Sequence, residues 1–578
     1  MERRWHVLTP DPEQVDALSG ALRCQPAVAA ALLNRGISNP ELAEPFLRPS
    51  FAHVRSPFLM KDVDRAVERI LLALHDREKV LIFGDYDTDG ITATALLFEF
   101  LAYLGADVHC HIPDRLTEGY GLSQDYIELH AIPNGVDLVI TVDCGISSHD
   151  AVNTARAAGI DVIITDHHEP PPSTPAAVAV LNPKQVDCPS GFSWLAGVGV
   201  AFNLVLALRK RLRDEGYWEK RQEPNLKAAC DLVALGTVGD MAPLVEENRI
   251  YVKAGLEVLA SDSRPGVQAL LDVSKLTDRR LSTRELAFRL APRLNAPGRL
   301  CHASSALELL TTPNLERART IAKELNQQNT KRQEIESKIL SEILEWLEKN
   351  PKLLEQRALV IDREGWHQGV IGIVASRLVN RYEKPAIVIT VTDGIGRGSA
   401  RSPDGFDLYE GLKICSRHLE KFGGHKAAAG LTVKAENIPA FRTDFERVVV
   451  QKTRPQDFVP EVVIDWEISA SDVSAELADE LEALAPFGVG NPEPVLMISD
   501  IDLLTARRVG THHLQMRFRP SAARNVKGNK SIDAIFFNQT SEVPQPGNLY
   551  RIACHVRWNR WREQKRMQLV IKAIDAVR

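Results

Sequence analysis

The sequence that decides the fold is Lys79-Val80-Leu81-Ile82-Phe83-Gly84-Asp85-Tyr86-Asp87-Thr88-Asp89-Gly90. Its apolar first half predicts a buried β-strand, and a helical pattern of apolar residues follows from Thr92 to Leu104. The acidic turn between them would lie at the carboxyl end of a parallel strand, where ligands of open α/β sheets bind. Three clustered carboxylates repel one another unless a cation neutralises them. An acidic surface loop explains one aspartate better than three, so the turn predicts a divalent-metal site.

Three more apolar segments, 137–142, 161–165 and 231–235, lead into acidic or imidazole side chains. These side chains are Asp143, Asp166, His167, His168 and Asp240. A doubly wound sheet would bring them to one edge. Carboxylates with imidazoles suit manganese or magnesium, and no cysteine pairs point to structural zinc. Any one of these residues alone would more often be a helix cap or a buried polar group, but the joint pattern favours a metal site.

The bulk composition sets wider limits. A chain of 578 residues has room for three or four domains, and 44% hydrophobic with 25% charged residues is ordinary for a soluble globular protein. There is no apolar run long enough to span a bilayer and no signal-peptide core at the N-terminus. Eight cysteines without CxxC spacing favour reduced thiols in the cytoplasm. The net charge of −6 gives no global attraction for nucleic acid, so a DNA substrate would require a local basic groove.

The four turns resemble the four motifs of the DHH phosphoesterases: Asp-Tyr-Asp-x-Asp-Gly, Val-Asp-Cys-Gly, Asp-His-His and Gly-Thr-Val-x-Asp. Within that superfamily nearly the whole chain is similar to the RecJ family of bacterial single-strand-specific exonucleases. The resemblance implies a hydrolase that uses two divalent cations, Mn²⁺ or Mg²⁺, to release nucleotides from single-stranded DNA in the 5′-to-3′ direction during repair and recombination.

The same resemblance implies a role for each metal-site residue. Asp87 would serve one metal, Asp89 would serve the other, and Asp143 would bridge them. His167 and Asp240 would complete the second site.

The resemblance also implies the residues around the metals. His168 would contact the scissile phosphate, while Asp166 and Asp85 would orient ligands from a second shell. Smaller DHH enzymes often place a histidine ligand four residues before the first metal-binding aspartate. Here that residue is Phe83, as in many RecJ proteins, which implies an exchangeable first metal.

Two segments of the first half carry candidate DNA contacts. Arg115 can pair with a phosphate and Tyr120 could stack on a base, in a loop similar to the Arg-x-x-Glu-Gly-Tyr-Gly of RecJ proteins. Arg293, Asn295 and Arg299 would form a phosphate clamp, in a segment similar to the family's Arg-Leu-Asn-Ala-x-Gly-Arg. Taken alone, each segment would be a solvated loop.

Three later segments, 366–372, 398–402 and 422–425, combine glycines that would expose backbone N–H groups with serine, arginine and histidine. Such groups suit a terminal phosphate. They resemble the substrate cleft of the DHH-associated domain, although Gly423-Gly424 alone would be a plain turn. The candidate contacts are His367, Ser399, Arg401, Gly423, Gly424 and His425. Those for the 5′ end itself are Arg299, Ser399, Arg401 and His425.

The C-terminal part reads as short alternating strands and predicts an OB-like barrel, which RecJ proteins also carry. Residues 557–562 interleave Trp558 and Trp561 with arginines, as single-strand-binding surfaces do. More cations lie nearby: Arg507, Arg508, Arg517, Arg519, Arg524, Lys527 and Lys530. A hairpin with solvated arginines explains the pattern equally well.

The predicted fold is therefore multidomain α/β. It comprises a helical cap (1–56) packed on the first domain, a parallel-sheet DHH catalytic domain (57–310) and a long spacer helix (311–352). A smaller α/β DHH-associated domain (353–455) and an OB-like nucleic-acid-binding barrel (456–578) complete it.

Other functions remain open at this stage. One is a DHH phosphodiesterase for short oligonucleotides or cyclic dinucleotides, which would need neither barrel nor spacer helix. Another is a catalytically silent DNA-binding scaffold, which should have lost a metal carboxylate. An inorganic pyrophosphatase would not need the barrel. A single site suggests a monomer. The resemblance further suggests that it works on single-stranded DNA with single-strand-binding protein and a helicase, and without a membrane.

Overall fold

The computed structural model describes residues 3–115, 117–261, 263–277, 280–510, 512–520, 531–539, 543–561 and 564–577. The chain divides into two units. One unit is Val54–Phe458, and the other combines Met1–His53 with Val459–Arg578. Among the described residues, no helix is long and apolar enough to cross a membrane.

The first unit contains a five-stranded, all-parallel sheet in the order β3-β2-β4-β5-β6. The strands are β2 (Lys79–Gly84), β3 (Asp107–His111), β4 (Leu138–Val142), β5 (Asp161–Thr165) and β6 (Ala179–Leu181). β2, β4 and β5 are apolar and buried almost throughout, as expected for strands covered on both faces. Because they are neighbours and parallel, their carboxyl ends meet at one edge.

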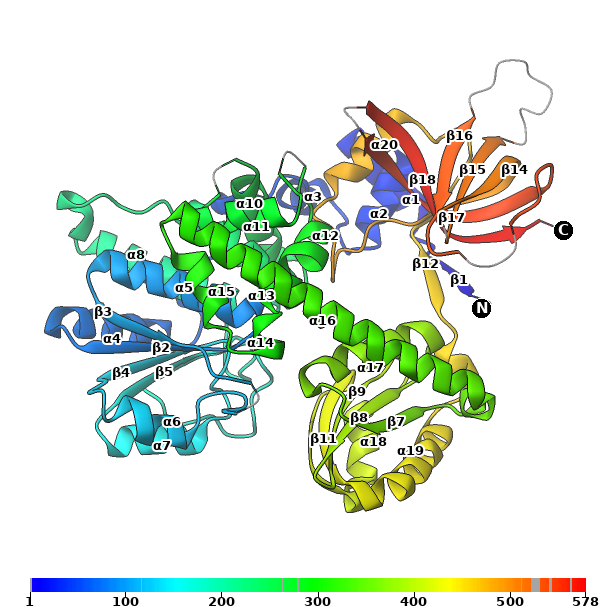
Figure 1. Cartoon of the computed structure of the whole chain (residues 1–578). Helices are drawn as coiled ribbons and strands as arrows, with labels where there is room; N and C mark the ends of the chain where they lie inside the picture. The colour runs from blue at the N-terminus through cyan, green and yellow to red at the C-terminus, as the bar shows by residue number, and fades with distance from the viewer. Residues whose placement is uncertain are drawn as a thin grey trace. The chain divides into compact units, whose positions relative to one another are not determined.

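Helices cover both faces of this sheet (Figure 1). The face of Leu81, Phe83 and Val139 packs on α7 and on the 124–131 segment, in one hydrophobic cluster. α5, α8 and α9 pack on one another on the other side. The α-helices of this first unit up to residue 261, with the η3 segment, are α4 (Val63–Asp76), α5 (Thr88–Leu104), α6 (Gln124–Tyr126) with η3 (Ile127–Ala131), α7 (His149–Ala157), α8 (Gly197–Asp214), α9 (Cys230–Gly239) and α10 (Glu246–Ser261).

A series of short helices leads from this domain to the spacer. They are α11 (Pro265–Val273), α12 (Thr283–Glu285), η6 (Leu286–Leu290), α13 (Ala291–Leu294), α14 (Pro297–Leu300) and α15 (Ser304–Thr311). The predicted spacer is the single 35-residue helix α16 (Leu315–Lys349). Asn314 caps its start by accepting from the backbone N–H groups of Glu316 and Arg317.

A second, mixed sheet follows the spacer, in the order β10-β11-β9-β8-β7. Its strands are β7 (Leu359–Glu364), β8 (Ala386–Thr392), β9 (Ile395–Arg401), β10 (Leu419–Gly424) and β11 (Ala428–Lys434). α17 (Gln368–Tyr382) and α16 share a core on one face. α18 (Leu408–Ile414) and α19 (Ile438–Lys452) cover the other face. Residues 398–401 are thus paired on both sides within β9, which corrects the expectation of exposed backbone N–H groups there.

The C-terminal part of the other unit is a closed five-stranded barrel. Its strands are β14 (Leu496–Val509), β15 (His513–Pro520), β16 (Ile532–Phe536), β17 (Leu549–Trp561) and β18 (Gln564–Ala576). They pair in the order β14-β15-β16-β18-β17, and β17 closes the barrel by pairing with β14. This is the predicted OB-like architecture. β13 (Trp466–Ile468) and α20 (Ala475–Ala483) precede it.

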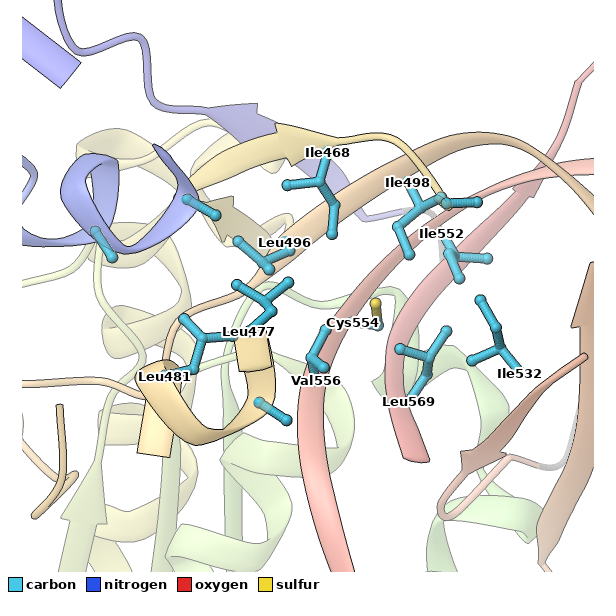
Figure 2. Packing of buried hydrophobic residues seen from close by; sticks show 14 of the residues in the cluster. Ile468, Leu477, Leu481, Leu496, Ile498, Ile532, Ile552, Cys554, Val556 and Leu569 are labelled. Carbon is cyan, nitrogen blue, oxygen red and sulfur yellow. The ribbon is translucent and has the colours of Figure 1, made fainter. Parts of the chain in front are cut away.

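The N-terminal helices correct one expectation, because they share a core with the barrel and not with the catalytic domain. These helices are α1 (Pro12–Leu22), α2 (Pro26–Leu33) and α3 (Pro40–Leu47). α2 is apolar on all sides and joins the cluster of α20 and the barrel strands, part of which is drawn in Figure 2. β1 (Arg4–Val7) also pairs with β12 (Glu461–Ile464). A helix with no polar face must be buried on every side, and the barrel provides that burial.

Candidate metal centre and substrate-binding residues

The acidic turn after β2 is held in shape by its own carboxylates and by glycine. Asp87 caps α5, and its Oδ1 accepts from the backbone N–H groups of Asp89 (2.9 Å) and Gly90 (3.1 Å). A Cβ at Gly90 would lie 2.6 Å from the backbone N and O of Asp85, so only glycine fits there. The turn thus presents Asp85 and Asp87 at the sheet edge.

Asp89 lies fully buried in the first turn of α5 and faces the start of α8. Its Oδ2 accepts from Gly197 N (2.6 Å) and its Oδ1 from Val198 N (2.8 Å). The positive end of the helix dipole favours a carboxylate at this place. The backbone N–H groups at the start of α8 thus bind a metal-site residue.

The ends of β4, β5 and α9 supply the remaining ligand candidates. The Nε2 atom of His167 lies 3.1 Å from Asp143 Oδ1, and 3.8 Å each from Asp89 Oδ2 and Asp240 Oδ2. The structure therefore brings together residues that lie far apart in the chain.

Three groups of side chains have ligand atoms within 4.8 Å of one another. Asp85, Asp87 and Asp143 form the first, Asp89, His167 and Asp240 the second, and Asp143, His167 and His168 the third. Asp143 is shared by the first and third groups, and His167 by the second and third. This is the arrangement that a bridging carboxylate between two cations requires.

Buried atoms without partners test whether this cluster suits metal ions. Asp85 Oδ1, Asp143 Oδ1 and His167 Nε2 are buried and have no hydrogen-bond partner among the residues that the structure describes. A buried polar atom without a partner is costly, whereas oxygen and imidazole ligands suit Mn²⁺ or Mg²⁺. The side chains present therefore fit two divalent cations.

The pKa values lead to the same conclusion. Burial and mutual repulsion raise the pKa of Asp85, Asp89 and Asp143 well above its usual range, and raise that of Asp240 to about 7. Burial, together with His168, lowers the pKa of His167 to about 3, so its imidazole is neutral and able to act as a ligand. Bound cations would restore the charged carboxylates.

His168 lies beside the cluster in a different environment. Its Nδ1 lies 2.8 Å from Asp166 Oδ1 and 3.2 Å from Tyr120 Oη. Burial alone would lower the pKa of His168, but the bond with Asp166 outweighs it and raises the pKa to about 9. Asp166 also accepts from the backbone N–H of Ile146 (2.9 Å), which fixes the carboxylate. Tyr120, half exposed, thus contacts His168 directly; its predicted base stacking stays a prediction.

Arginines from two domains of the first unit gather near the acidic turn. Arg299 donates to the Gly369 carbonyl at the start of α17 (3.4 Å), and Arg401 donates to Ser399 Oγ (3.3 Å). Burial, then the repulsion of Arg115 and Arg332, lowers the pKa of Arg299 to about 10. Burial and Arg115 likewise lower the pKa of Arg401. Within the described part of the chain, Arg115, Arg299 and Arg401 form no ion pair, so an anion would stabilise them.

Arg293 and Asn295 have different surroundings from those expected of a phosphate clamp. Arg293 donates to Asn326 Oδ1 (3.0 Å) on α16 and to the Arg289 carbonyl (2.5 Å). Asn295 Oδ1 accepts from the backbone N–H (2.7 Å) and Oγ1 (2.9 Å) of Thr88. In this structure both residues hold protein elements together.

Residues of the smaller domain lie around the start of α17 and the β10–β11 hairpin. His367 caps α17, and its Nδ1 accepts from Gly369 N (3.2 Å). Gly423 is exposed, and a Cβ there would meet nothing within 4 Å. Gly424 has a φ of +143°, and the exposed His425 donates its backbone N–H to the Ala428 carbonyl (2.7 Å). Gly369 links His367 to Arg299, and Ala428 pairs with Arg401 in the sheet, so both groups of residues neighbour the arginines.

The described side chains of residues 557–560 contact other parts of the protein, and the predicted role of this surface in DNA binding stays a prediction. Trp558 Nε1 donates to Asp479 Oδ1 on α20 (2.8 Å), and Lys565 Nζ lies 4.0 Å from the Trp558 ring centroid. Arg560 is paired with Glu482 of α20, and Arg557 with Glu493. Trp558 is therefore part of the protein's own packing. The side chain of Trp561 and the cations Arg524, Lys527, Lys530 and Arg562 lie outside the described residues.

The other predicted cations of the barrel also have protein partners. Arg507 donates to Gln515 Oε1 (2.9 Å) and Arg508 to the Gln539 carbonyl (3.2 Å). Arg517 is paired with Asp533, and Arg519 with Asp502.

Two further residues of the site carried little sequence signal. A Cβ at Gly298 would lie 2.5 Å from the carbonyl of Tyr86, so this glycine permits α14 to approach the metal turn. Arg332 lies on α16 and adds charge to the Arg299 cluster, although Glu336 and Asn329 bind it. In the sequence, Gly298 stands out only as part of the Arg-Leu-Asn-Ala-Pro-Gly-Arg motif. Arg332 belongs to a long helical pattern and does not stand out at all.

Comparison with known protein families finds matches to three parts of the chain, each of which contains one of the three larger sheets. The model for the DHH family, N-terminal domain, matches residues 79–237, the DHHA1 domain model matches 353–451, and the RecJ OB domain model matches 464–573.

Similar curated proteins include the single-stranded-DNA-specific exonucleases RecJ of Bacillus subtilis and Escherichia coli. The first is 38% identical over 575 residues, which cover 98% of this chain and 70% of that protein. The second is 38% identical over 528 residues, which cover 89% of this chain and 90% of that protein.

Solved structures agree with this result. The crystal structure of RecJ from Thermus thermophilus in complex with Mn²⁺ has a TM-score of 0.84 at 30% identity, over 99% of this chain and 79% of that chain. The Mg²⁺ complex from the same organism has a TM-score of 0.75 at 29% identity, over 99% and 78%.

Proposed function

This chain belongs to the RecJ family of single-stranded-DNA-specific exonucleases, and we propose that it hydrolyses single-stranded DNA in the 5′-to-3′ direction at the cluster around His167. The observation that carries this proposal is the set of buried, unpartnered carboxylate and imidazole atoms at the ends of β2, β4 and β5. The enzyme is a metal-dependent hydrolase, and Mn²⁺ or Mg²⁺ is its cofactor.

The residues that would hold the cations follow from the three groups. Asp87 would hold one cation and Asp89 the other, with Asp143 between them and His167 and Asp240 completing the second site. Two cations in such a site polarise a phosphodiester and supply hydroxide near neutral pH. Asp85 would orient these metal ligands without itself being assigned to either cation.

The remaining residues bind and orient the strand. His168, held protonated by Asp166, would donate from its Nε2 atom to an oxygen of the scissile phosphate. Arg115, Arg299 and Arg401, with Ser399, would bind the 5′-terminal phosphate, which sets the direction of digestion. His425 and the Gly423–Gly424 turn would line the same path, together with His367.

We assign the parts of the chain to this activity as follows. Residues 57–310 would form the catalytic domain that cleaves the DNA, and residues 311–352 the spacer helix. Residues 353–455 would recognise the 5′ end of the DNA strand. Residues 456–578 contribute the barrel, to which the N-terminal helices belong by their packing. We further propose a monomeric, cytoplasmic enzyme that acts beside single-strand-binding protein and a helicase. Eight free cysteines support a reducing compartment.

The test is digestion of end-labelled single strands with Mn²⁺ or Mg²⁺, with the label at either end, beside a blunt duplex. We expect mononucleotide release from the 5′ end of the single strand alone. Asp143→Asn should lower the rate by at least about a thousandfold while single-strand binding persists. Release from the 3′ end would refute the proposed direction, and full activity of Asp143→Asn would refute the assigned centre.

A further inference from the structure

The loop between β3 and α6 carries two of the proposed site residues, and their side chains reach two different parts of the centre. The Arg115 guanidinium lies 5.2 Å from the centroid of the Tyr86 ring, in the metal turn. The Tyr120 hydroxyl lies 3.2 Å from His168 Nδ1. Arg115 is exposed, Tyr120 is half exposed, and a Cβ at the adjacent Gly119 would meet nothing within 4 Å. The two ends of the loop are buried at Ile112 and Leu122, whereas Arg115 and Tyr120 lie on its more exposed middle part.

Glu118 fastens the loop at its middle. Its Oε1 accepts from the backbone N–H of Asp114 (2.8 Å), and its Oε2 lies 2.9 Å from Nε2 of His111, the last residue of β3. The backbone N–H groups of Glu118 and Gly119 also donate to the Asp114 carbonyl, at 2.8 and 3.1 Å. One carboxylate thus connects the loop to the end of a sheet strand.

His111, which the Glu118 carboxylate contacts, is itself held in place by packing against aromatic rings. The His111 ring lies 4.3 Å from Tyr126 and 5.4 Å from Phe83, measured between centroids. Phe83 is fully buried in β2, directly before the metal turn. Through His111 and Phe83, the Glu118 carboxylate therefore connects the loop to β2, the strand that positions Asp85 and Asp87.

We propose that Glu118 is a positioning residue that holds Arg115 toward the 5′-terminal phosphate and Tyr120 against His168. The inference rests on the proposed function, because the 5′ phosphate defines the task of Arg115. Glu118 itself acts through Arg115, Tyr120 and His111, without contact to the DNA.

The experiment measures kcat and KM on 5′-phosphorylated and 5′-hydroxyl single strands for Glu118→Ala, Arg115→Ala and the double variant. Glu128→Ala is the matched control: Glu128 is also an exposed acid, lies in η3, and accepts from Gln124 Nε2 (2.7 Å). We expect Glu118→Ala to lower kcat/KM on the phosphorylated strand by about tenfold and to reduce the preference for it. Adding Glu118→Ala to Arg115→Ala should change that preference little, and Glu128→Ala should behave like the wild type.

The outcomes separate this inference from the function on which it rests. Equal losses on both strands in Glu118→Ala, with the preference intact, would mean a merely structural role and overturn the proposal. A preference lost in Arg115→Ala but kept in Glu118→Ala overturns the role of Glu118 alone. A preference kept in Arg115→Ala refutes the phosphate site and the inference together, while metal-dependent cleavage of single strands would still stand. If Glu118→Ala does not fold, Glu118→Gln and His111→Phe test the same contact.

Discussion

His167 and His168 are adjacent in the chain but have opposite protonation states because their partners differ. Burial, together with the neighbouring His168, lowers the pKa of His167 to about 3, while the carboxylates around it would bind cations. His168 shares a hydrogen bond with Asp166, which raises its pKa to about 9. A neutral imidazole is a ligand and an imidazolium is a donor, so one dipeptide supplies both functions.

His168→Gln should therefore lower kcat by about a hundredfold or more, with a small effect on metal affinity, because only a phosphate donor is removed. The wild-type rate should fall as the pH rises through the pKa of His168. Bound cations nearby lower that pKa, so this limb lies no higher than about pH 9. Rate profiles from about pH 6 to about pH 10 check this expectation. A His168→Gln enzyme that keeps the wild-type alkaline limb would contradict it.

The ligand residues were predictable from sequence because each follows an apolar strand or helix, and parallel strands end at one edge. Gly197 was not predictable, since its contribution is a backbone N–H group and the space left by its missing Cβ. Arg293 and Asn295 were predicted as DNA contacts from residue type and from the resemblance of their segment to RecJ proteins, and this role stays a prediction. Their partners Asn326 and Thr88 are 33 and 207 positions distant, and no local pattern reveals such partners.

At the scale of single elements, the start of α8 is where a small change should affect the centre most. A Cβ at Gly197 would lie 2.5 Å from Asp143 Oδ1, and the N–H of Gly197 binds Asp89. Gly197→Ala should therefore displace a shared ligand and weaken Mn²⁺ binding by about 10- to 100-fold. Titration calorimetry with Mn²⁺ measures the affinity directly.

Gly199→Ala provides the control within the same helix. Its Cβ would meet the flexible end of Leu195 at 3.1 Å and Asn248 Oδ1 at 3.6 Å, and neither residue belongs to the metal site. We expect a loss of thermal stability without a comparable loss of affinity. Equal Mn²⁺ affinities in both variants would show that α8 does not position the ligands.

The barrel strand β17 shows why an element's surface role is harder to predict than its existence. Alternation of apolar residues predicts the strand, and the Arg-Trp-Asn-Arg-Trp-Arg pattern suggests a nucleic-acid surface. α20, about eighty residues earlier in the chain, supplies Asp479 and Glu482 to Trp558 and Arg560. The cation and aromatic pattern is thus largely neutralised by a partner that no local reading can supply.

At the scale of the whole molecule, chain order predicted the wrong neighbour for the N-terminal helices. Their apolar character correctly predicts burial, but β1 pairs with β12, more than 450 residues later. The order of the other domains follows the chain, because each has its own sheet and core.

This division predicts two separate unfolding transitions. All five proposed metal ligands lie within Val54–Phe458, while the N-terminal helices and the barrel share a core of their own. Mn²⁺ at about a hundred times its dissociation constant should stabilise the first unit by about 2.7 kcal/mol and leave the second unchanged. Differential scanning calorimetry with and without Mn²⁺ should therefore show one transition that shifts and one that does not. Asp143→Asn should abolish the shift. A single transition that moves as a whole would mean that the two units unfold cooperatively, and that metal binding stabilises the barrel as well.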